Sequence, residues 1–191
     1  MTCSRYTESD SGRLKVVTST TRPTGASRYI GQHIYETDTD RRLYFDGTGW
    51  IILSEPSRFY APSLAGVTVG TGGIVDGYYH RSDGFVDFNA YVHLGSSGFS
   101  VASAPVIGLP FAYSSGREFE VLTCLLYDNS TGGRYQAWVN ANSTTTVAIT
   151  CINTAGSYAI YAAITSTTPF TWAANDAIVL AGRYRMGSRY S

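Results

Sequence analysis

The sequence predicts an all-β protein: a small three-stranded meander followed by a jelly-roll-like antiparallel β-sandwich. Short runs alternate apolar and polar residues with a period of two, and clusters of Gly, Asp, Asn and Ser separate them. No stretch keeps apolar residues at helical spacing between capping residues. From Ile74 onward the runs recur about every ten residues, a spacing typical of sandwiches and barrels.

The N-terminal part of the chain divides into an arm, a meander and a linker. Residues 1–25 are polar, rich in Ser and Thr, and predict an extended N-terminal arm. Residues 26–56 contain three strand-like runs, and Asp46-Gly47 provides the turn before the last of them. The segment 57–73 is rich in Gly and predicts a linker. Because three short strands bury little apolar surface, we expect the meander to share a core with other copies of the chain.

The remaining residues, 74–191, predict the sandwich. Its first two runs, "IVDGYYHR" and "FVDFNAYVHL", are joined by Ser82-Asp83-Gly84, a hairpin signal. The run "PVIGLPF" has a proline near each end and predicts an edge strand, because proline cannot donate a ladder hydrogen bond. Five further runs follow: "EFEVLTCLLY", "RYQAWVNA", "TTVAITCI", "SYAIYAAI" and "AIVLAGRYRM".

Bulk composition excludes several classes of partner. The 191 residues carry 14 basic and 14 acidic side chains, so no nucleic acid partner is expected. No apolar run is long enough to span a membrane, and the first ten residues lack the features of a signal peptide. Charged residues make up 15% of the chain, against roughly 25% in an average soluble protein. This low charge is typical of a surface that neighbouring copies cover.

The sequence offers no arrangement of catalytic or metal-binding residues, so we expect no enzyme, no cofactor and no metal. His80 and His93 could approach each other across the 82–84 hairpin, but the favoured interpretation is polar residues on a ribbon. The three cysteines lack metal-ligand spacing. Cys124 and Cys151 lie in apolar runs and are expected to be buried thiols, with a bridge between them as the alternative.

Several aromatic residues are predicted to point away from the core. In the run 134–141, alternation sends Trp138 outward, and Tyr91 projects with Asn89 and His93. Outward rings of this kind bury against a neighbouring subunit or stack on sugar rings. The candidate residues for a subunit interface, or alternatively a glycan platform, are Trp50, Tyr44, Tyr91 and Trp138.

Two stretches resemble proteins of bacteriophage tails. The first is "TSTTRPT" followed by "GQHIYETDTDRRLYFDGTGW", which resembles a segment recurring in phage tail and fibre proteins. In this chain its positions are Thr21-Arg22-Pro23, Gly31-Gln32, Ile34 to Thr39, Leu43-Tyr44-Phe45 and Asp46-Gly47 with Trp50. The second is "GYYHR" together with Pro169–Met186, which resembles the β-sandwich at the end of many such virion proteins.

The resemblance implies a homotrimeric virion component made in the host bacterial cytoplasm. Its N-terminal region would dock on other virion proteins, and its sandwich would face outward, where it could bind a bacterial surface glycan. Long fibres carry a shaft between their ends, whereas this chain has only residues 57–73. A short tail or baseplate spike is therefore expected. The alternatives are a capsid decoration or head-fibre protein and, from another class, a cellular carbohydrate-binding module.

Overall fold

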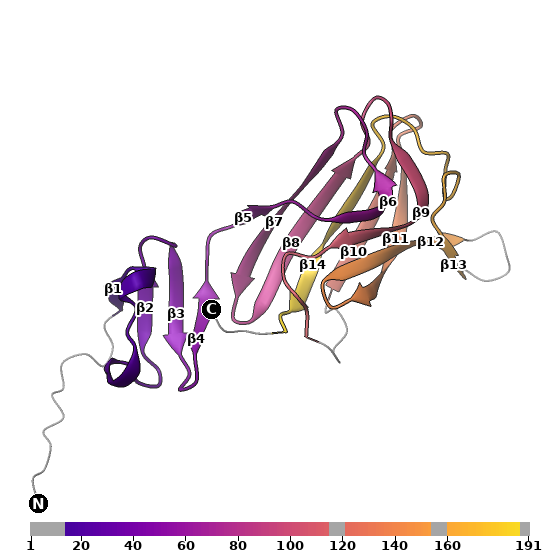
Figure 1. Cartoon of the computed structure of the whole chain (residues 1–191). Helices are drawn as coiled ribbons and strands as arrows, with labels where there is room; N and C mark the ends of the chain where they lie inside the picture. Colours follow the sequence, from indigo (N-terminus) through magenta and orange to yellow (C-terminus); the bar gives the residue numbers. More distant parts are fainter. Residues whose placement is uncertain (1–13, 115–120, 154–159, 188–191) are drawn as a thin grey trace, which may run out of the picture.

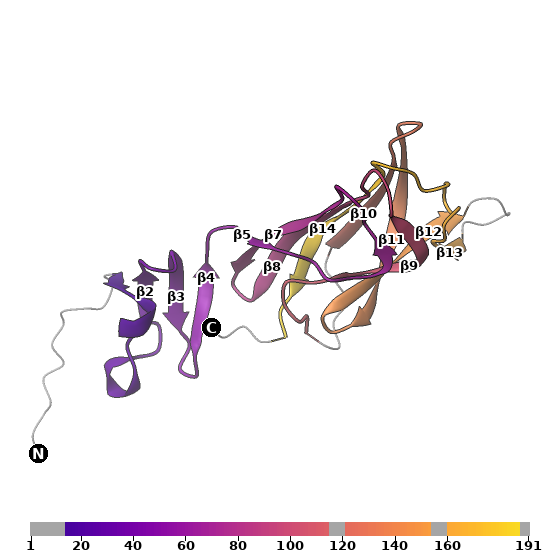
Figure 2. The same ribbon diagram turned by 45° about the horizontal axis from the view of Figure 1, so that its top comes forward.

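The computed structural model describes residues 14–114, 121–153 and 160–187, and it confirms the all-β fold class. The described strands form two separate sheets, a small one near the N-terminus and a large curled one (Figure 1). Figure 2 shows the curl, in which β9 and β12 lie across from β7, β8 and β14. The small sheet stands beside the end of the large sheet at which β5 and β7 lie.

The small sheet contains the predicted meander and one additional strand. Strands β2, β3 and β4 pair antiparallel in chain order, as the sequence predicts, and β1 pairs parallel with β2. Part of the segment 1–25, which was expected to be an extended arm, therefore forms a strand of this sheet. A strand of three residues is too short to show a period in sequence, which is why the pattern missed it. The bounds are β1 Lys15–Val17, β2 His33–Glu36, β3 Arg41–Phe45 and β4 Trp50–Ser54.

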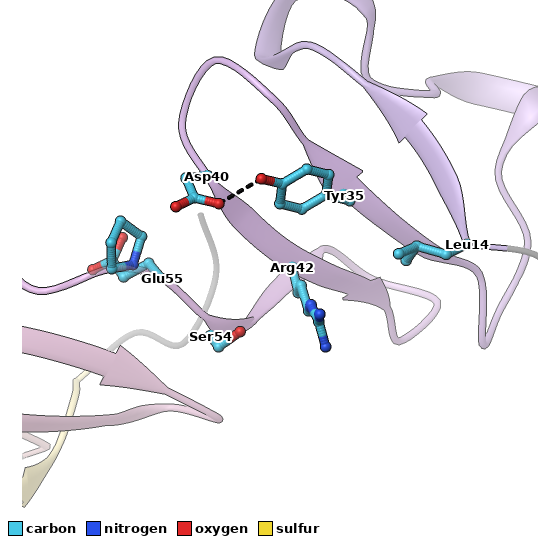
Figure 3. A pocket seen from close by; sticks show the side chains of 7 residues that line it. Leu14, Tyr35, Asp40, Arg42, Ser54 and Glu55 are labelled. Atoms are coloured by element: carbon cyan, nitrogen blue, oxygen red, sulfur yellow. Dashed lines mark hydrogen bonds between the residues drawn. The ribbon is translucent and has the colours of Figure 1, made fainter.

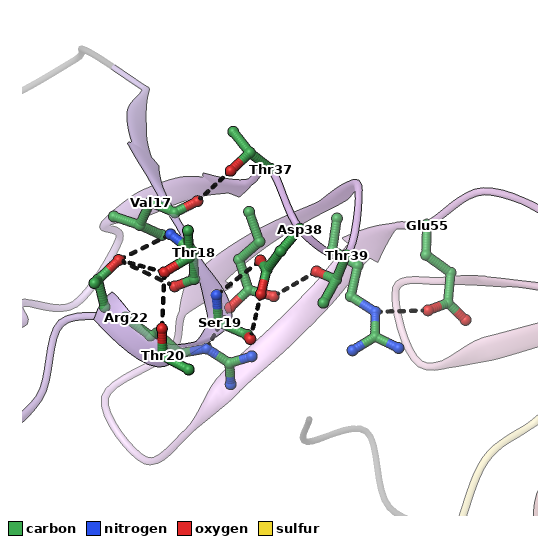
Figure 4. A network of polar contacts seen from close by, with 12 residues as sticks. Val17, Thr18, Ser19, Thr20, Arg22, Thr37, Asp38, Thr39 and Glu55 are labelled. Atoms are coloured by element: carbon green, nitrogen blue, oxygen red, sulfur yellow. Dashed lines mark hydrogen bonds and ion pairs between the residues drawn. The ribbon is translucent and has the colours of Figure 1, made fainter.

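Side-chain contacts tie the segment after β1 to the β2–β3 turn (Figure 4). The Ser19 amide and hydroxyl donate to the two carboxylate oxygens of Asp38, at 2.8 and 2.5 Å. Arg22 donates through Nε to the buried Glu36 at 2.6 Å, and the Thr39 hydroxyl donates to the other oxygen of Glu36. The Arg-Pro segment thus closes over one edge of the sheet.

One face of the small sheet forms a core within a single chain. The register places Ile34, Leu43 and Ile52 in one row across the three antiparallel strands. Trp50 packs against Phe45 with ring centroids 5.4 Å apart and is only 5% exposed. The full cluster comprises Val17, Ile34, Leu43, Phe45, Trp50 and Ile52.

The large sheet is antiparallel between neighbours and has the order β5-β7-β8-β14-β10-β11-β12-β9-β6, with β13 paired to β12. Its inner face holds one continuous core, to which β8 contributes Val86, Phe88, Ala90 and Val92. The bounds are β5 Arg58–Tyr60, β6 Leu64–Thr68, β7 Ile74–Ser82, β8 Phe85–His93, β9 Ser100–Gly108, β10 Val121–Asp128, β11 Gly133–Ser143, β12 Thr146–Asn153, β13 Ile160–Ala163 and β14 Ala177–Arg185.

Two sequence expectations about this sheet are corrected. The predicted linker, 57–73, contains β5 and β6, which are strands of the large sheet. The predicted edge strand, β9, instead lies between β12 and β6. Its Pro105 is accommodated because the pairing with β6 shifts register around Gly66. Gly66 has a φ of +76°, and a Cβ there would lie 2.9 Å from the Ala104 carbonyl oxygen.

The cysteines in strands β10 and β12 are free, as the sequence favours. Cys124 is in register with Ala137 of β11, and Ala137 is in register with Cys151. A whole strand therefore separates the two thiols by about 10 Å, beyond the roughly 7 Å between Cα atoms that a disulfide tolerates. Both thiols are free and buried. The alternative of a bridge between them is wrong.

Burial should make both thiols unreactive in the folded protein. It raises the pKa of Cys124 to about 12, and it also raises the pKa of Cys151. In a Cys3→Ser variant, we expect no labelling by a thiol reagent near pH 8.5, the ordinary thiol range of about 8–9, until denaturant is added. Two thiols should then react. Rapid labelling of the folded chain would contradict this burial.

Candidate functional site

A buried carboxylate joins the two sheets. Glu55 follows β4, and its side chain is fully buried. Arg81 of β7 donates to both of its oxygens, at 2.5 and 2.9 Å, and Arg41 of β3 donates to it at 2.8 Å. Arg58 of β5 lies 3.7 Å from Glu55 and donates to the carbonyl of Thr39. One anion is therefore shared by arginines of both sheets.

Backbone and ring contacts strengthen this joint. The Asp83 amide at the β7–β8 turn donates to the carbonyl of Ile52, and the Ser82 hydroxyl donates to the carbonyl of Leu53. The guanidinium of Arg81 also lies 4.5 Å from the ring centroid of Phe111. These two hydrogen bonds hold the small sheet to the β7–β8 hairpin in addition to the Glu55 ion pairs, and the ring of Phe111 packs on Arg81 from the large sheet.

Two opposing effects set the ionisation of Glu55. Burial is the largest single effect and raises the pKa of the carboxyl, because a low dielectric disfavours charge. The hydrogen bonds and charges of Arg81, followed by those of Arg41, act in the other direction. Together they hold the pKa of Glu55 below its ordinary value of 4.5. The joint therefore contains a carboxylate at neutral pH.

A hollow of about 400 Å³ lies beside the joint on the small sheet (Figure 3). The Tyr35 hydroxyl donates to Asp40 at 2.5 Å, and this bond is the main reason that the pKa of Tyr35 is raised. The hollow presents the carboxylate of Asp40, the guanidinium of Arg42 and the apolar side chain of Leu14. Its lining residues are Leu14, Tyr35, Asp40, Arg42, Ser54, Glu55 and Pro56.

The four aromatic residues singled out from the sequence lie in different places. Trp50 is enclosed in the small-sheet core, so its own chain already buries it and we no longer assign it to an interface or glycan site. Tyr44 lies on the opposite face of that sheet, stacked on His33 with centroids 5.9 Å apart. Tyr91 is half-buried and stacks on His93. Trp138 points outward from the large sheet, as alternation predicts, and is 48% exposed.

Trp138 belongs to an apolar patch on the outer face of β11, β12 and β13. Its ring lies 5.4 Å from that of Tyr161, which is 60% exposed. The neighbouring polar pair is uncharged, with Asn140 donating to the Thr150 hydroxyl. This surface, the Trp138 patch, comprises Trp138, Tyr161 and the exposed Ile152.

A second aromatic pair escaped sequence reasoning. Phe59 of β5 is in register with Tyr78 of β7, and their rings lie 5.8 Å apart at 78°. Both side chains are more than half exposed. Phe59 lies in the segment expected to be a linker, so its partner was not visible in sequence. In β7, Gly77 and Arg81 are buried on one face, and Tyr78 lies on the opposite face. The alternation of side chains along a strand could have predicted this outward position from the sequence.

The structure does not bring the histidines of the β7–β8 ribbon together. His80 is in register with Asp87, whereas His93 is in register with Ile74 at the far end of the ribbon. Within the described residues, no group of three or more His, Cys, Asp or Glu side chains is placed to hold a metal ion. The same residues contain no helix long and apolar enough to cross a membrane.

Comparisons with known proteins show one distant structural similarity and no sequence match. The chain matches no protein-family model and no curated protein sequence. Among solved structures it is similar to the Dettilon tailspike protein, with a TM-score of 0.43 and 18% sequence identity. The similarity covers 68% of this chain and 23% of that one. We therefore infer the function of this chain from its own residues.

Removing the charge of Glu55 should destabilise the protein strongly. A Glu55→Gln variant leaves arginines around a neutral group, and breaking a buried ion pair in this way costs about 3 kcal/mol of unfolding free energy. Denaturant titration measures this loss. The matched control is Asp87→Asn, whose ion pair with Arg183 is half exposed at 3.9 Å and contributes under about 0.5 kcal/mol. Equal effects of the two variants would contradict the proposed role of the joint.

The joint should also make stability depend on acidity. Because the folded pKa of Glu55 is lowered, its contribution is complete above the ordinary value of 4.5 and is lost as the pH falls through the folded value. We expect the melting temperature of the native chain to fall more steeply below pH 4.5 than that of Glu55→Gln. Asp38 and Asp128 also have lowered pKa values and affect both proteins alike. Parallel curves would show that Glu55 is not responsible.

Proposed function

We propose that this protein is a non-enzymatic structural component of a bacteriophage virion, a short homotrimeric spike of the tail or baseplate. The observation that carries the proposal is the Trp138 patch, which exposes two large rings and Ile152 without a charged residue among them. Interface cores have this composition, being enriched in aromatic residues and depleted of charge. The low charge of the whole chain agrees with extensive contact between copies.

The area of the patch indicates how much binding it can supply. Large aromatic side chains bury roughly 150–250 Å² each, and these two are about half exposed. Covering both rings removes roughly 200 Å² from water, which contributes about 5 kcal/mol at 25 cal/mol per Å². Association itself costs about 4 kcal/mol or more. The patch alone barely offsets this cost, so a stable trimer needs further contacts.

The small sheet offers those contacts. Its exposed apolar side chains include Leu14 just before β1, Val16 within β1, and Tyr29 and Ile30 before β2. We propose that this region docks on neighbouring copies and on other virion proteins. The hollow beside Tyr35, Asp40 and Arg42 provides polar recognition next to those apolar side chains. The Glu55 joint would then transmit the position of the small sheet to the outer sheet.

Truncating the Trp138 patch should weaken assembly. We expect light scattering after size exclusion to give a mass of three chains for the native protein at micromolar concentration. The double variant Trp138→Ala with Tyr161→Ala should shift toward single chains, because it removes most of the apolar area in the patch.

The control is Phe59→Ala, which removes a similarly exposed ring from β5, an end strand of the large sheet that does not pair with β11, β12 or β13. Its mass should stay that of the native protein. A native chain that is monomeric at the same concentration would refute the trimer.

A further inference from the structure

We propose that the Glu55 joint is a latch, whose release lets the small sheet swing away from the large sheet while both sheets stay folded. The event that releases the latch is the loss of the charge on Glu55. The inference goes beyond the proposed function, because it concerns the two sheets of a single chain and does not depend on what that chain assembles with.

Each sheet has an apolar core of its own. Within the described ranges, the core cluster of the small sheet and that of the large sheet share no residue. The Arg22–Glu36 ion pair and the bonds from Ser19 to Asp38 also lie entirely on the small-sheet side. Separation of the two sheets therefore leaves both apolar cores and these internal contacts in place.

One short piece of chain connects the two sheets. All four strands of the small sheet precede Glu55, and the large sheet begins with β5 at Arg58 (Figure 1). Residues 55–57 are in neither a strand nor a helix, and Pro56 and Ser57 are exposed. A hinge needs only a few residues at the end of an element that absorb changes of backbone angle. Because proline fixes its own φ, the pivot lies mainly at Ser57.

The polar contacts that hold the sheets together centre on Glu55. Arg81 of β7 donates to both of its carboxylate oxygens, and Arg58 of β5 lies 3.7 Å from it. Arg41 donates to Glu55 from β3, within the small sheet itself. If Glu55 becomes neutral, three guanidinium groups remain close together without a counter-charge, and their repulsion and desolvation favour separation.

Acid is one way to remove this charge. The arginines that face Glu55 from β3, β5 and β7 keep their own charge in acid. Burial raises the pKa of Glu55, but the arginines outweigh it and hold the pKa below the ordinary value of 4.5. The latch is therefore complete above 4.5 and opens as the pH falls through the folded value. The hollow beside the joint adds the titratable or charged side chains of Tyr35, Asp40 and Arg42.

The test measures the distance between the sheets by double electron–electron resonance between two spin labels. Thr48→Cys places one label on the small sheet and Gln136→Cys places the other on β11, and both positions are exposed. The labels are introduced into a Cys3→Ser chain, in which the buried thiols of β10 and β12 stay unlabelled. Refolding with an excess of unlabelled chain ensures that each measured pair lies within one chain.

The native chain should give a narrow distance distribution near neutral pH. We expect the distribution to widen about twofold or more in Glu55→Gln at the same pH, because the hinge is then free. The native chain should widen in the same way when it is acidified to about pH 3. An unchanged distribution in Glu55→Gln would overturn the inference.

Two arginine variants separate a latch from a general loss of stability. Arg81→Gln removes the main partner of Glu55 on the large sheet and should widen the distribution as Glu55→Gln does. Arg41→Gln removes a partner on the small sheet, leaves Arg81 in place and should keep the distribution narrow. Equal widening in the two variants would contradict the latch.

Label pairs within each sheet show whether the sheets stay folded after release. The pair Val16→Cys with Thr48→Cys lies within the small sheet, and the pair Ala102→Cys with Gln136→Cys lies within the large one. Both pairs should keep their native distance distributions in the Glu55→Gln background. Widening of either pair would overturn the inference, because that sheet would then be unfolding. The mass from light scattering separately decides the proposed trimer.

Discussion

The pairing of buried Glu55 with arginines from both sheets is the interaction on which the arrangement of this molecule depends. Removing a carboxylate from water is costly, and only the surrounding guanidinium groups make it tolerable. Hydrophobic contact between the sheets would be non-directional, whereas a carboxylate accepts hydrogen bonds from particular directions. The joint therefore orients the small sheet on the large one, and it does so through Arg41 on one side and Arg81 on the other.

The exposed rings of the large sheet fall into two groups with different neighbours. Trp138 and Tyr161 lie at the β11–β13 side among uncharged groups, and Phe59 and Tyr78 lie at the β5–β7 side beside Asp87. The rings of the first group lie beside the Asn140–Thr150 pair, whereas the hollow beside Tyr78 also contains the charged Asp87.

Local chemistry explains why most strands were predictable from sequence. The Asp46-Gly47 turn is held by Asp46, which accepts from the amides of Thr48 and Gly49. Alternation in β8 likewise places every second residue in the core, and this pattern can be read without knowing which strands pair with β8. β1 and β5 were missed because three residues carry no measurable period. The edge prediction for Pro105 was wrong because the register shift that accommodates it lies at Gly66, 39 residues earlier in the chain.

The sequence by itself determined the all-β class, the meander, the hairpin turns and the outward position of Trp138, since each depends on neighbours within a few residues. Only the tertiary structure decided that Trp50 is buried by its own chain, that Glu55 collects arginines from both sheets, and that Phe59 meets Tyr78. Those contacts join residues far apart along the chain. Which strands become neighbours is set by the closure of a whole core, and no local pattern encodes it.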